Sequence, residues 1–391
     1  MTTETKTLDK NSIASTYARF DLEIVRGKGS LVYDENGKEY IDMNTGIAVN
    51  TFGYSDDEWI DAVSEQIKKF QHTSNLYYSA PCALLASELC SRTGAKKVFF
   101  GNSGAEANEC AIKSARKWAL DNKGEGYYNI ITLKNGFHGR TITTLAATAQ
   151  DSFHTLFNPF TEGFLYAPSD DLDSIAKLAK ENKCAAIMME LVQGEGGVMP
   201  LEKSFVDGVV AIAKEENLLI IIDEVQTGNG RTGYLYAYEG YGISPDIVST
   251  AKGLAGGLPI GATLFFDKTA TTLTPGTHGS TFGGNPLSCA GALNVLKRID
   301  EKLLKEVREK SDYVKEALSG AEGIKSVTGM GLMLGIETEK DASEVIRISM
   351  ENGVLPIKAK NKVRLLPALN IPMPLLKKAV EVIKIAAKPE K

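Results

Sequence analysis

Short apolar runs alternate with amphipathic segments through the middle of the chain, and this alternation constrains the fold more than any other feature. The most apolar run, 218–222, ends in an acid, Asp223. Strands that are covered on both faces consist of such continuous apolar runs, whereas half-exposed strands alternate apolar and polar residues. We therefore expect buried strands at 98–100, 129–133, 184–190, 218–223, 247–250 and 261–266.

Helices are expected between these strands, at 106–121, 171–182 and 204–217. In the second of them, Leu172, Ile175 and Leu178 form one apolar stripe at helical spacing. Alternation of strands and helices over this length predicts an α/β domain whose central sheet is mostly parallel and sandwiched by helices.

The two ends of the chain have a different pattern. Residues 24–42 predict a small hairpin, and long charged helices are expected after Pro286, at 303–318, 342–352 and 374–387. We therefore expect a large domain at 56–285 and a smaller α+β domain that is built from both termini, 1–55 and 286–391.

Composition excludes several classes of protein. Of 391 residues, 43% are apolar and 24% charged, as in ordinary globular proteins, and the net charge of −5 gives no basic footprint for nucleic acid. The run 218–222 is far too short to span a membrane. Five scattered cysteines without a CxxC pair, and four isolated histidines, favour a cytosolic enzyme with reduced thiols and without a metal site.

An anion site is one interpretation of the segment Asn-Ser-Gly-Ala-Glu-Ala-Asn at 102–108, which follows the first strand. Ser103 and Glu106 have the spacing of a capping box, and Gly104 lets the backbone approach a ligand at a helix N-terminus. The same residues would equally suit an ordinary strand–turn–helix corner.

Two residues at predicted strand tips could bind a cofactor covalently or by charge. Asp223 could hold a cationic group in the crevice beyond its strand, or simply cap a loop. Lys252 follows the strand at 247–250 and is flanked by Gly253, Gly256 and Gly257, which suits an imine-forming amine, although a surface lysine is the simpler alternative.

Further candidates follow other strands. Phe137 and Arg140 offer an aromatic plane and a carboxylate-binding guanidinium, Glu190 and Glu195 end another strand, and Arg364 is a second anion clamp. The motif GxGxxG at 228–233 opens no helix, so it does not support a nicotinamide dinucleotide site.

Taken together, these pieces resemble the class III aminotransferases, pyridoxal-phosphate enzymes of fold type I, and within them the acetylornithine aminotransferases. The resemblance covers nearly the whole chain and is densest at 223–233, 252–261 and 278–286. Two positions depart from the family pattern: Leu191 stands where proline is frequent, and 53–57 reads Gly-Tyr-Ser-Asp-Asp instead of Gly-His-x-His-Pro.

The resemblance implies roles for individual residues. Lys252 would form the imine and carry the proton, and Asp223 would pair with the ring nitrogen of the cofactor. The other cofactor-binding positions that it implies are Ser103, Gly104, Ala105, Phe137, His138, Glu190, Val225, Gln226, Ser280 and Thr281. Of these, Gln226 would contact the phenolic oxygen, Phe137 and Val225 would cover the two ring faces, and Thr281 would reach the phosphate of the neighbouring subunit in a homodimer.

The implied reaction passes the side-chain amino group of N-acetylornithine to 2-oxoglutarate. Tyr17 and Arg140 would hold the carboxylate of the donor while Glu195 masks Arg364, and Glu195 would then release Arg364 for the keto acid. Ornithine, succinylornithine, succinyldiaminopimelate and 4-aminobutyrate remain alternative donors. A noncatalytic scaffold and a nicotinamide-dependent oxidoreductase are the alternatives from other classes.

Overall fold

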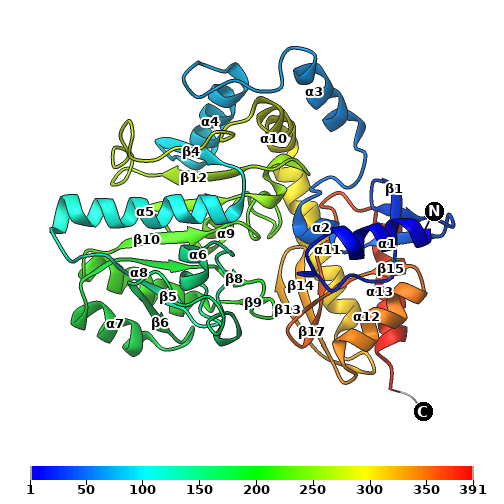
Figure 1. Ribbon diagram of the computed structural model, residues 1–391. Coiled ribbons are helices and arrows are strands. Elements are labelled where there is room, and N and C mark those ends of the chain that lie inside the picture. Colours follow the sequence, from blue (N-terminus) through cyan, green and yellow to red (C-terminus); the bar gives the residue numbers. More distant parts are fainter. Residues whose placement is uncertain (1, 390–391) are drawn as a thin grey trace.

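A seven-stranded sheet forms the centre of the computed structural model, which describes residues 2–389 (Figure 1). Its strands are β4 (Lys97–Gly101), β5 (Asn129–Leu133), β6 (Phe164–Ala167), β7 (Cys184–Met189), β10 (Leu219–Asp223), β11 (Ile247–Thr250) and β12 (Gly261–Phe265). The order is β4-β12-β11-β10-β7-β5-β6, and only β12 runs antiparallel to its neighbours. The predicted mostly parallel sheet is confirmed, with β6 as an additional edge strand.

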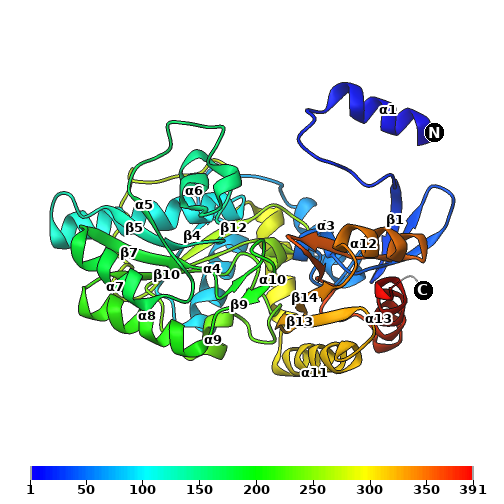
Figure 2. The same ribbon diagram turned by 90° about the horizontal axis from the view of Figure 1, so that it is seen from below.

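Helices cover both faces of this sheet (Figure 2). On one side lies α5 (Gly104–Lys123), and on the other lie α7 (Leu172–Glu181) and α8 (Lys203–Glu215). Alternate residues of β10 belong to different apolar clusters: Ile221 packs with residues of α5, whereas Ile222 packs with residues of α8. Burial on both faces is the reason that these strands are continuous apolar runs.

Both termini contribute to a second region beside the sheet. The helix α1 (Thr2–Ser12) precedes β1 (Ile24–Lys28), β2 (Leu31–Asp34) and β3 (Glu39–Asp42), and β15 (Val354–Leu355) extends their sheet in the order β1-β2-β3-β15. The predicted hairpin is therefore present, and its last strand pairs with a segment more than three hundred residues further on.

A third sheet, β13-β14-β17-β16, lies in the same region. Its strands and the surrounding helices are β13 (Ile324–Met330), β14 (Met333–Thr338), β16 (Ile357–Ala359), β17 (Lys362–Leu365), α11 (Glu301–Leu318), α12 (Ala342–Glu351) and α13 (Met373–Ala387). The domain division at 55/56 and 285/286 stays a prediction, and Met1 and residues 390–391 at its outer ends lie outside the described residues.

Short elements connect these layers. They are α2 (Thr45–Ala48), α3 (Asp57–Ile67), α4 (Ala80–Thr93), α6 (Ile142–Ala147), η1 (Asp151–Phe153), β8 (Val192–Gln193), β9 (Met199–Pro200), α9 (Ala237–Tyr241), η2 (Lys252–Ala255) and α10 (Pro286–Arg298). Both α3 and α4 pack against α10 at the top of Figure 1. Within residues 2–389, no helix is long and apolar enough to cross a membrane.

Candidate active site

The candidate residues of the central region meet at one edge of the seven-stranded sheet. The strands β4, β5, β7, β10 and β11 run parallel to one another, so their carboxyl ends point the same way. At or shortly after these ends lie Ser103, Phe137, Glu190, Asp223 and Lys252. Ligand sites of open α/β sheets form at this edge, where loops and helix N-termini surround a crevice.

Asp223 is held by hydrogen bonds from three separate groups. Its Oδ2 accepts from Asn108 Nδ2 at 2.8 Å and lies 2.8 Å from His138 Nδ1, while its Oδ1 accepts from the backbone N–H of Val225 at 3.0 Å. The carboxylate is 3% exposed. Asn108 was not predicted to act here, although its position one helical turn after Gly104 places it on the same face of α5.

The same amide group fixes the loop behind Asp223. Asn108 Nδ2 also donates to the carbonyl oxygen of His138 at 2.7 Å. His138 is buried, and burial works against its charged form, but the hydrogen bond and the negative charge of Asp223 raise the pKa of this histidine above its ordinary value. The predicted cofactor residue His138 therefore contacts Asp223 directly.

Glu190 anchors the loops that follow β5 and β7. Its carboxylate accepts hydrogen bonds from the backbone N–H groups of Phe137, at 2.8 Å, and Gly194, at 3.1 Å. Burial raises the pKa of Glu190 to about 7, because the charged form loses its hydration. These contacts fix the backbone of Phe137 at the edge of the sheet where β5 and β7 end.

The helix α5 begins with a cap that differs in detail from the expected capping box. Ser103 Oγ accepts from the N–H of Glu106 at 3.2 Å, as predicted, but the Glu106 carboxylate accepts from the N–H of Asn102 at 2.8 Å. The helix starts at Gly104, two residues before the expected start. A Cβ at Gly104 would lie 2.6 Å from Val225 Cγ1, so glycine here also lets Val225 pack against the start of α5.

Lys252 sits on a strained turn. Its φ of +46° is in the left-handed region, which costs a side chain with a Cβ of the order of 1 kcal/mol. Its amine has no hydrogen-bond partner among residues 2–389, and burial lowers the pKa of Lys252, although the charge of Glu195 opposes this shift. Strain of this kind is common at functional sites, where the surrounding structure holds it in place.

A second strained turn, α2, packs against the Lys252 turn and was not expected from the sequence. Thr45, Gly46, Ile47 and Ala48 all have positive φ values, between +52° and +67°. Asn44 stabilises this left-handed turn by accepting from the N–H of Gly46 at 2.8 Å. Only a structure can reveal such a turn, because three of its four residues ordinarily avoid this conformation.

The predicted ion pair between Glu195 and Arg364 is present. Arg364 Nη1 lies 2.6 Å from Glu195 Oε1 and donates to Gln226 Oε1 at 3.2 Å. Burial works against the charge of Glu195, but Arg364 outweighs it and lowers the pKa of this glutamate. Arg364 comes from β17, so the pair joins the C-terminal region to the loops of the central sheet.

Arg140 lies next to the aromatic residue that follows β5. Its guanidinium is exposed and stands over the rings of Phe153, 4.4 Å from the centroid, and Phe137, 5.7 Å from the centroid. This placement leaves its N–H groups accessible to a carboxylate.

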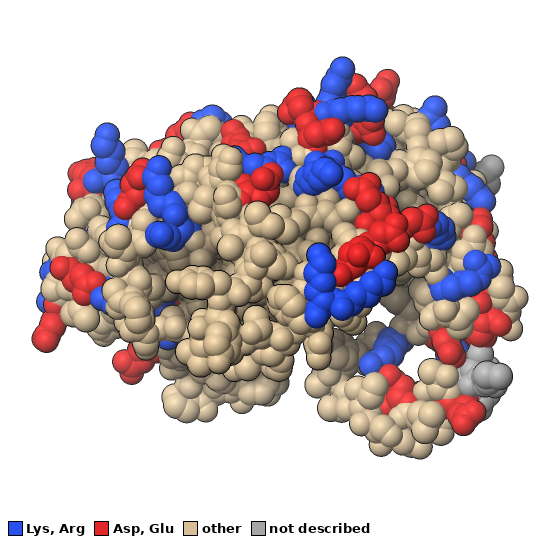
Figure 3. Space-filling model, turned by 90° about the horizontal axis from the view of Figure 1, so that it is seen from above, with Lys and Arg blue, Asp and Glu red and all other residues tan. Residues whose placement is uncertain are grey.

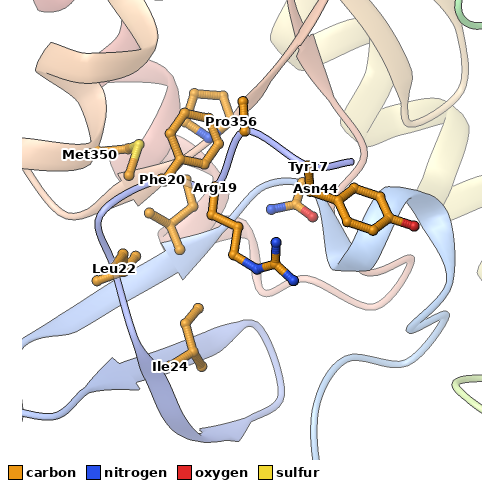
Figure 4. A pocket seen from close by; sticks show the side chains of 10 residues that line it. Tyr17, Arg19, Phe20, Leu22, Ile24, Asn44, Met350 and Pro356 are labelled. Carbon is orange, nitrogen blue, oxygen red and sulfur yellow. The ribbon is translucent and has the colours of Figure 1, made fainter. Parts of the chain in front are cut away.

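Tyr17 lines a hollow that does not include Lys252 or Asp223 and that lies between residues 17–24 and the end of α12. The other residues that line it include Asn44, Met350 and Pro356 (Figure 4). The tyrosine side chain is largely exposed. The structure does not bring Tyr17 into contact with Arg140, but it lies beside Asn44, which caps the α2 turn next to Lys252.

Ser280 and Thr281 lie in the segment before α10, and within residues 2–389 neither forms a hydrogen bond with Lys252. Ser280 Oγ accepts from Asn102 Nδ2 at 3.2 Å, and Thr281 is exposed in a surface hollow that His72, Asn75 and Phe99 help to line. Ser280 thus stabilises the loop before α5. Among the residues that the structure describes, Thr281 forms no hydrogen bond to a residue of the site.

Comparisons with known proteins match nearly the whole chain. The family model described as "Aminotransferase class-III" matches residues 12–386. An acetylornithine aminotransferase from Haemophilus ducreyi is 48% identical over 97% of each chain, and one from Aquifex aeolicus is 45% identical over 95% of this chain and 98% of its own. The crystal structure of an ornithine aminotransferase from Toxoplasma gondii superimposes with a TM-score of 0.95 at 31% identity, covering 99% of this chain and 95% of the other.

Proposed function

The chain belongs to the class III aminotransferases, which use pyridoxal 5′-phosphate, and on this premise we propose that it moves the side-chain amino group of N-acetylornithine to 2-oxoglutarate. The products would be N-acetylglutamate semialdehyde and glutamate, a step of arginine biosynthesis. One observation carries the proposal: an unbonded lysine amine stands at the same sheet edge as a buried, firmly held carboxylate and a carboxylate-binding arginine.

The residues at this edge fit the cofactor. Asp223 would pair with its ring nitrogen, Lys252 would bond to its aldehyde carbon, and the N–H groups of Gly104 and Ala105 would receive its phosphate at the start of α5. Phe137, Val225 and Gln226 would surround the ring. When bound, the cofactor supplies an electron sink that stabilises negative charge on the donor carbon.

The chain's own residues would perform the proton transfers. Since burial lowers the pKa of Lys252, more of its Nζ is neutral near pH 7 and able to take a proton from the donor carbon. The same Nζ would then give this proton up again, which completes the transfer. Asp223 keeps its position throughout, because three donors hold it.

Two substrates must use the site in turn, and the Glu195–Arg364 pair is suited to separate them. Arg140 would hold the α-carboxylate of the donor while Glu195 neutralises Arg364, and Tyr17 would have to move from its own hollow to join it. For 2-oxoglutarate, Glu195 would swing away, so that Arg364 binds the α-carboxylate and Arg140 the distal one. Glu195 is flanked by Gly194, Gly196 and Gly197, which permit this movement.

A homodimer with shared active sites is part of the proposal. Thr281 is exposed, and large apolar side chains are exposed around α4, including Leu76, Tyr77, Tyr78 and Phe282. On the face that Figure 3 shows, charged side chains lie at the left end, along the upper edge and over the right half, and they leave a broad uncharged area in the lower centre. Exposed apolar patches of this kind typically bind another protein surface.

We also propose that the enzyme works in the cytoplasm. All five cysteines carry free thiols, as is typical of proteins in a reducing compartment.

A comparison of donors tests the choice of substrate. Purified enzyme with 2-oxoglutarate is supplied with N-acetylornithine, ornithine, succinylornithine, succinyldiaminopimelate or 4-aminobutyrate, and glutamate formation is measured. We expect kcat/KM for N-acetylornithine to exceed that for ornithine by about tenfold or more, or about 1.4 kcal/mol. A higher kcat/KM for ornithine, the substrate named for the Toxoplasma gondii structure, would contradict the proposal.

A further inference from the structure

Arg231 is a buried cation that the proposed reaction does not use. Its side chain is 3% exposed, and no carboxylate among residues 2–389 pairs with it. Instead, Nη1 donates to the carbonyl oxygens of Leu332, at 3.0 Å, and Pro367, at 2.6 Å. Burial lowers the pKa of Arg231 to about 9, because the guanidinium loses its hydration without a counter-charge. Such a residue is costly for the fold, so a specific role is expected.

The two carbonyl groups belong to the strand ends nearest to Arg364. Leu332 directly precedes β14, and Pro367 follows β17 by two residues. These strands pair side by side, with Gly335 opposite Arg364 and Leu334 opposite Leu365. Arg231 therefore holds the two adjacent strand ends beside the arginine that pairs with Glu195.

The backbone of Arg231 lies on the other side of the site, in the loop that carries Gln226. Arg231 lies in the loop after β10, which also carries Gln226, and Gln226 contacts both Arg364 and Glu195. The carbonyl oxygen of Arg231 accepts from the N–H of Leu332 at 2.9 Å, so the loop and the strand end bind each other reciprocally. A Cβ at Gly331, whose φ is +56°, would lie 2.5 Å from that same oxygen, which shows how closely the two backbones meet.

From this geometry we infer that Arg231 is a positioning residue, which sets the distance between Arg364 and the Glu195–Gln226 side of the crevice and so governs binding of 2-oxoglutarate. The inference rests on the proposed function, in which Arg364 receives the α-carboxylate of the keto acid. Arg231 touches neither substrate nor cofactor. Its effect would fall mainly on the half-reaction that uses Arg364, because Asn108 and His138, which hold Asp223, come from outside this loop.

Arg308 provides a matched control. It is also an arginine that joins the C-terminal region to this loop, since its Nη1 donates to the carbonyl oxygen of Gly233 and its Nη2 pairs with Glu301. These two partners lie in the loop after β10 and on α11, and neither belongs to β14 or β17. Arg308→Met thus removes a comparable link without loosening the strand that carries Arg364.

The experiment measures each half-reaction separately by single-turnover absorbance of the holoenzyme in Arg231→Met, Arg231→Lys and Arg308→Met. For Arg231→Met we expect kcat/KM for 2-oxoglutarate to fall about thirtyfold, mainly through KM, while that for N-acetylornithine changes less than about threefold. Arg231→Lys, which keeps a cation and a donor, should show the same bias at about threefold, and Arg308→Met should show none.

Equal losses in both half-reactions, or a ratio like that of wild type, would overturn the inference and leave Arg231 a purely structural residue. If Arg231→Met does not fold, Arg231→Lys decides by the same ratio. Wild-type enzyme in the same series separates the two claims: failure of wild type to pass an amino group from N-acetylornithine to 2-oxoglutarate would overturn the proposed function itself.

Discussion

The two ends of the active site differ in how firmly they are held. Asp223 is buried and receives three hydrogen bonds, from α5 and from the loops after β5 and β10, all within the large central region. The Glu195–Arg364 pair joins two regions, and its glutamate is 31% exposed. A carboxylate that several donors hold is fixed, whereas a partly exposed ion pair exchanges readily with water or a ligand. The comparison indicates a rigid cofactor end and a switchable substrate end.

The largest effect is expected from Lys252→Ala at the rigid end. This variant removes both the amine that bonds to the cofactor and the group that moves the proton, so both half-reactions should slow by at least about 10³-fold. Single-turnover assays of each half-reaction measure the loss. A half-reaction that keeps more than a tenth of its wild-type rate would show that another group moves the proton.

Glu224, the residue after Asp223, allows the effect of a buried acid on the free energy of unfolding to be measured at the rigid end. Glu224 is fully buried, accepts from the N–H of Tyr238 at 2.9 Å, and has its pKa raised to about 7 by burial. The folded state therefore holds a proton that the unfolded state, with a pKa near 4.5, has already released. The free energy of unfolding should fall as pH rises through this window, by about 3 kcal/mol from this group.

Glu224→Gln should remove that part of the slope, since glutamine does not titrate. Urea denaturation at pH 5 and pH 8 measures the difference between wild type and variant, with the exposed Glu215→Gln as the control. If the free energy of unfolding depended on pH in the same way in wild type and Glu224→Gln, the buried Glu224 would affect stability no more than a surface acid does.

At the switchable end, Arg364→Met should affect the keto acid selectively. Loss of a paired charge–carboxylate contact weakens binding by about 2 kcal/mol, so KM for 2-oxoglutarate should rise about thirtyfold with little change in the N-acetylornithine half-reaction. The control is Arg298→Met, which breaks the 2.6 Å ion pair between Arg298, at the end of α10, and Asp56. An equal rise for both substrates would remove the distinction between the two carboxylate sites.

Glu195→Gln should produce the smallest and most specific effect. Glutamine leaves Arg364 without a neutralising charge, so the donor's carboxylate would be drawn to Arg364 instead of Arg140, and the N-acetylornithine half-reaction should slow about tenfold. The 2-oxoglutarate half-reaction should keep its rate, because Glu195 leaves Arg364 in that step. If the ratio of the two rates matched that of wild type, Glu195 would not act as a switch.

Much of the rigid end was predictable from the sequence because its signals are local. Asp223 ends an apolar run and Lys252 follows a short strand, and parallel strands bring such ends to one edge. The Ser103 cap was likewise visible in a short segment. The ion pair between Glu195 and Arg364 was expected only through resemblance to a family, since 169 residues separate the two.

What the sequence did not reveal depends on tertiary contacts. The left-handed turn at Thr45–Ala48 contradicts the local preferences of its residues and exists because neighbouring loops hold it. Asn108 was in a segment already singled out, but its partners, Asp223 and His138, come from two other loops. The Glu106 carboxylate accepts from the N–H of Asn102 and not from the N–H of Ser103. This difference depends on the path of the chain just before the helix.

Chemical trapping tests the central claim most directly, namely that the amine of Lys252 bonds to the cofactor. The holoenzyme is reduced with borohydride, digested, and its peptides are mapped by mass spectrometry. We predict a single phosphopyridoxyl adduct, on Lys252. An adduct on a different lysine, or a fully loaded enzyme without any adduct, would contradict the account.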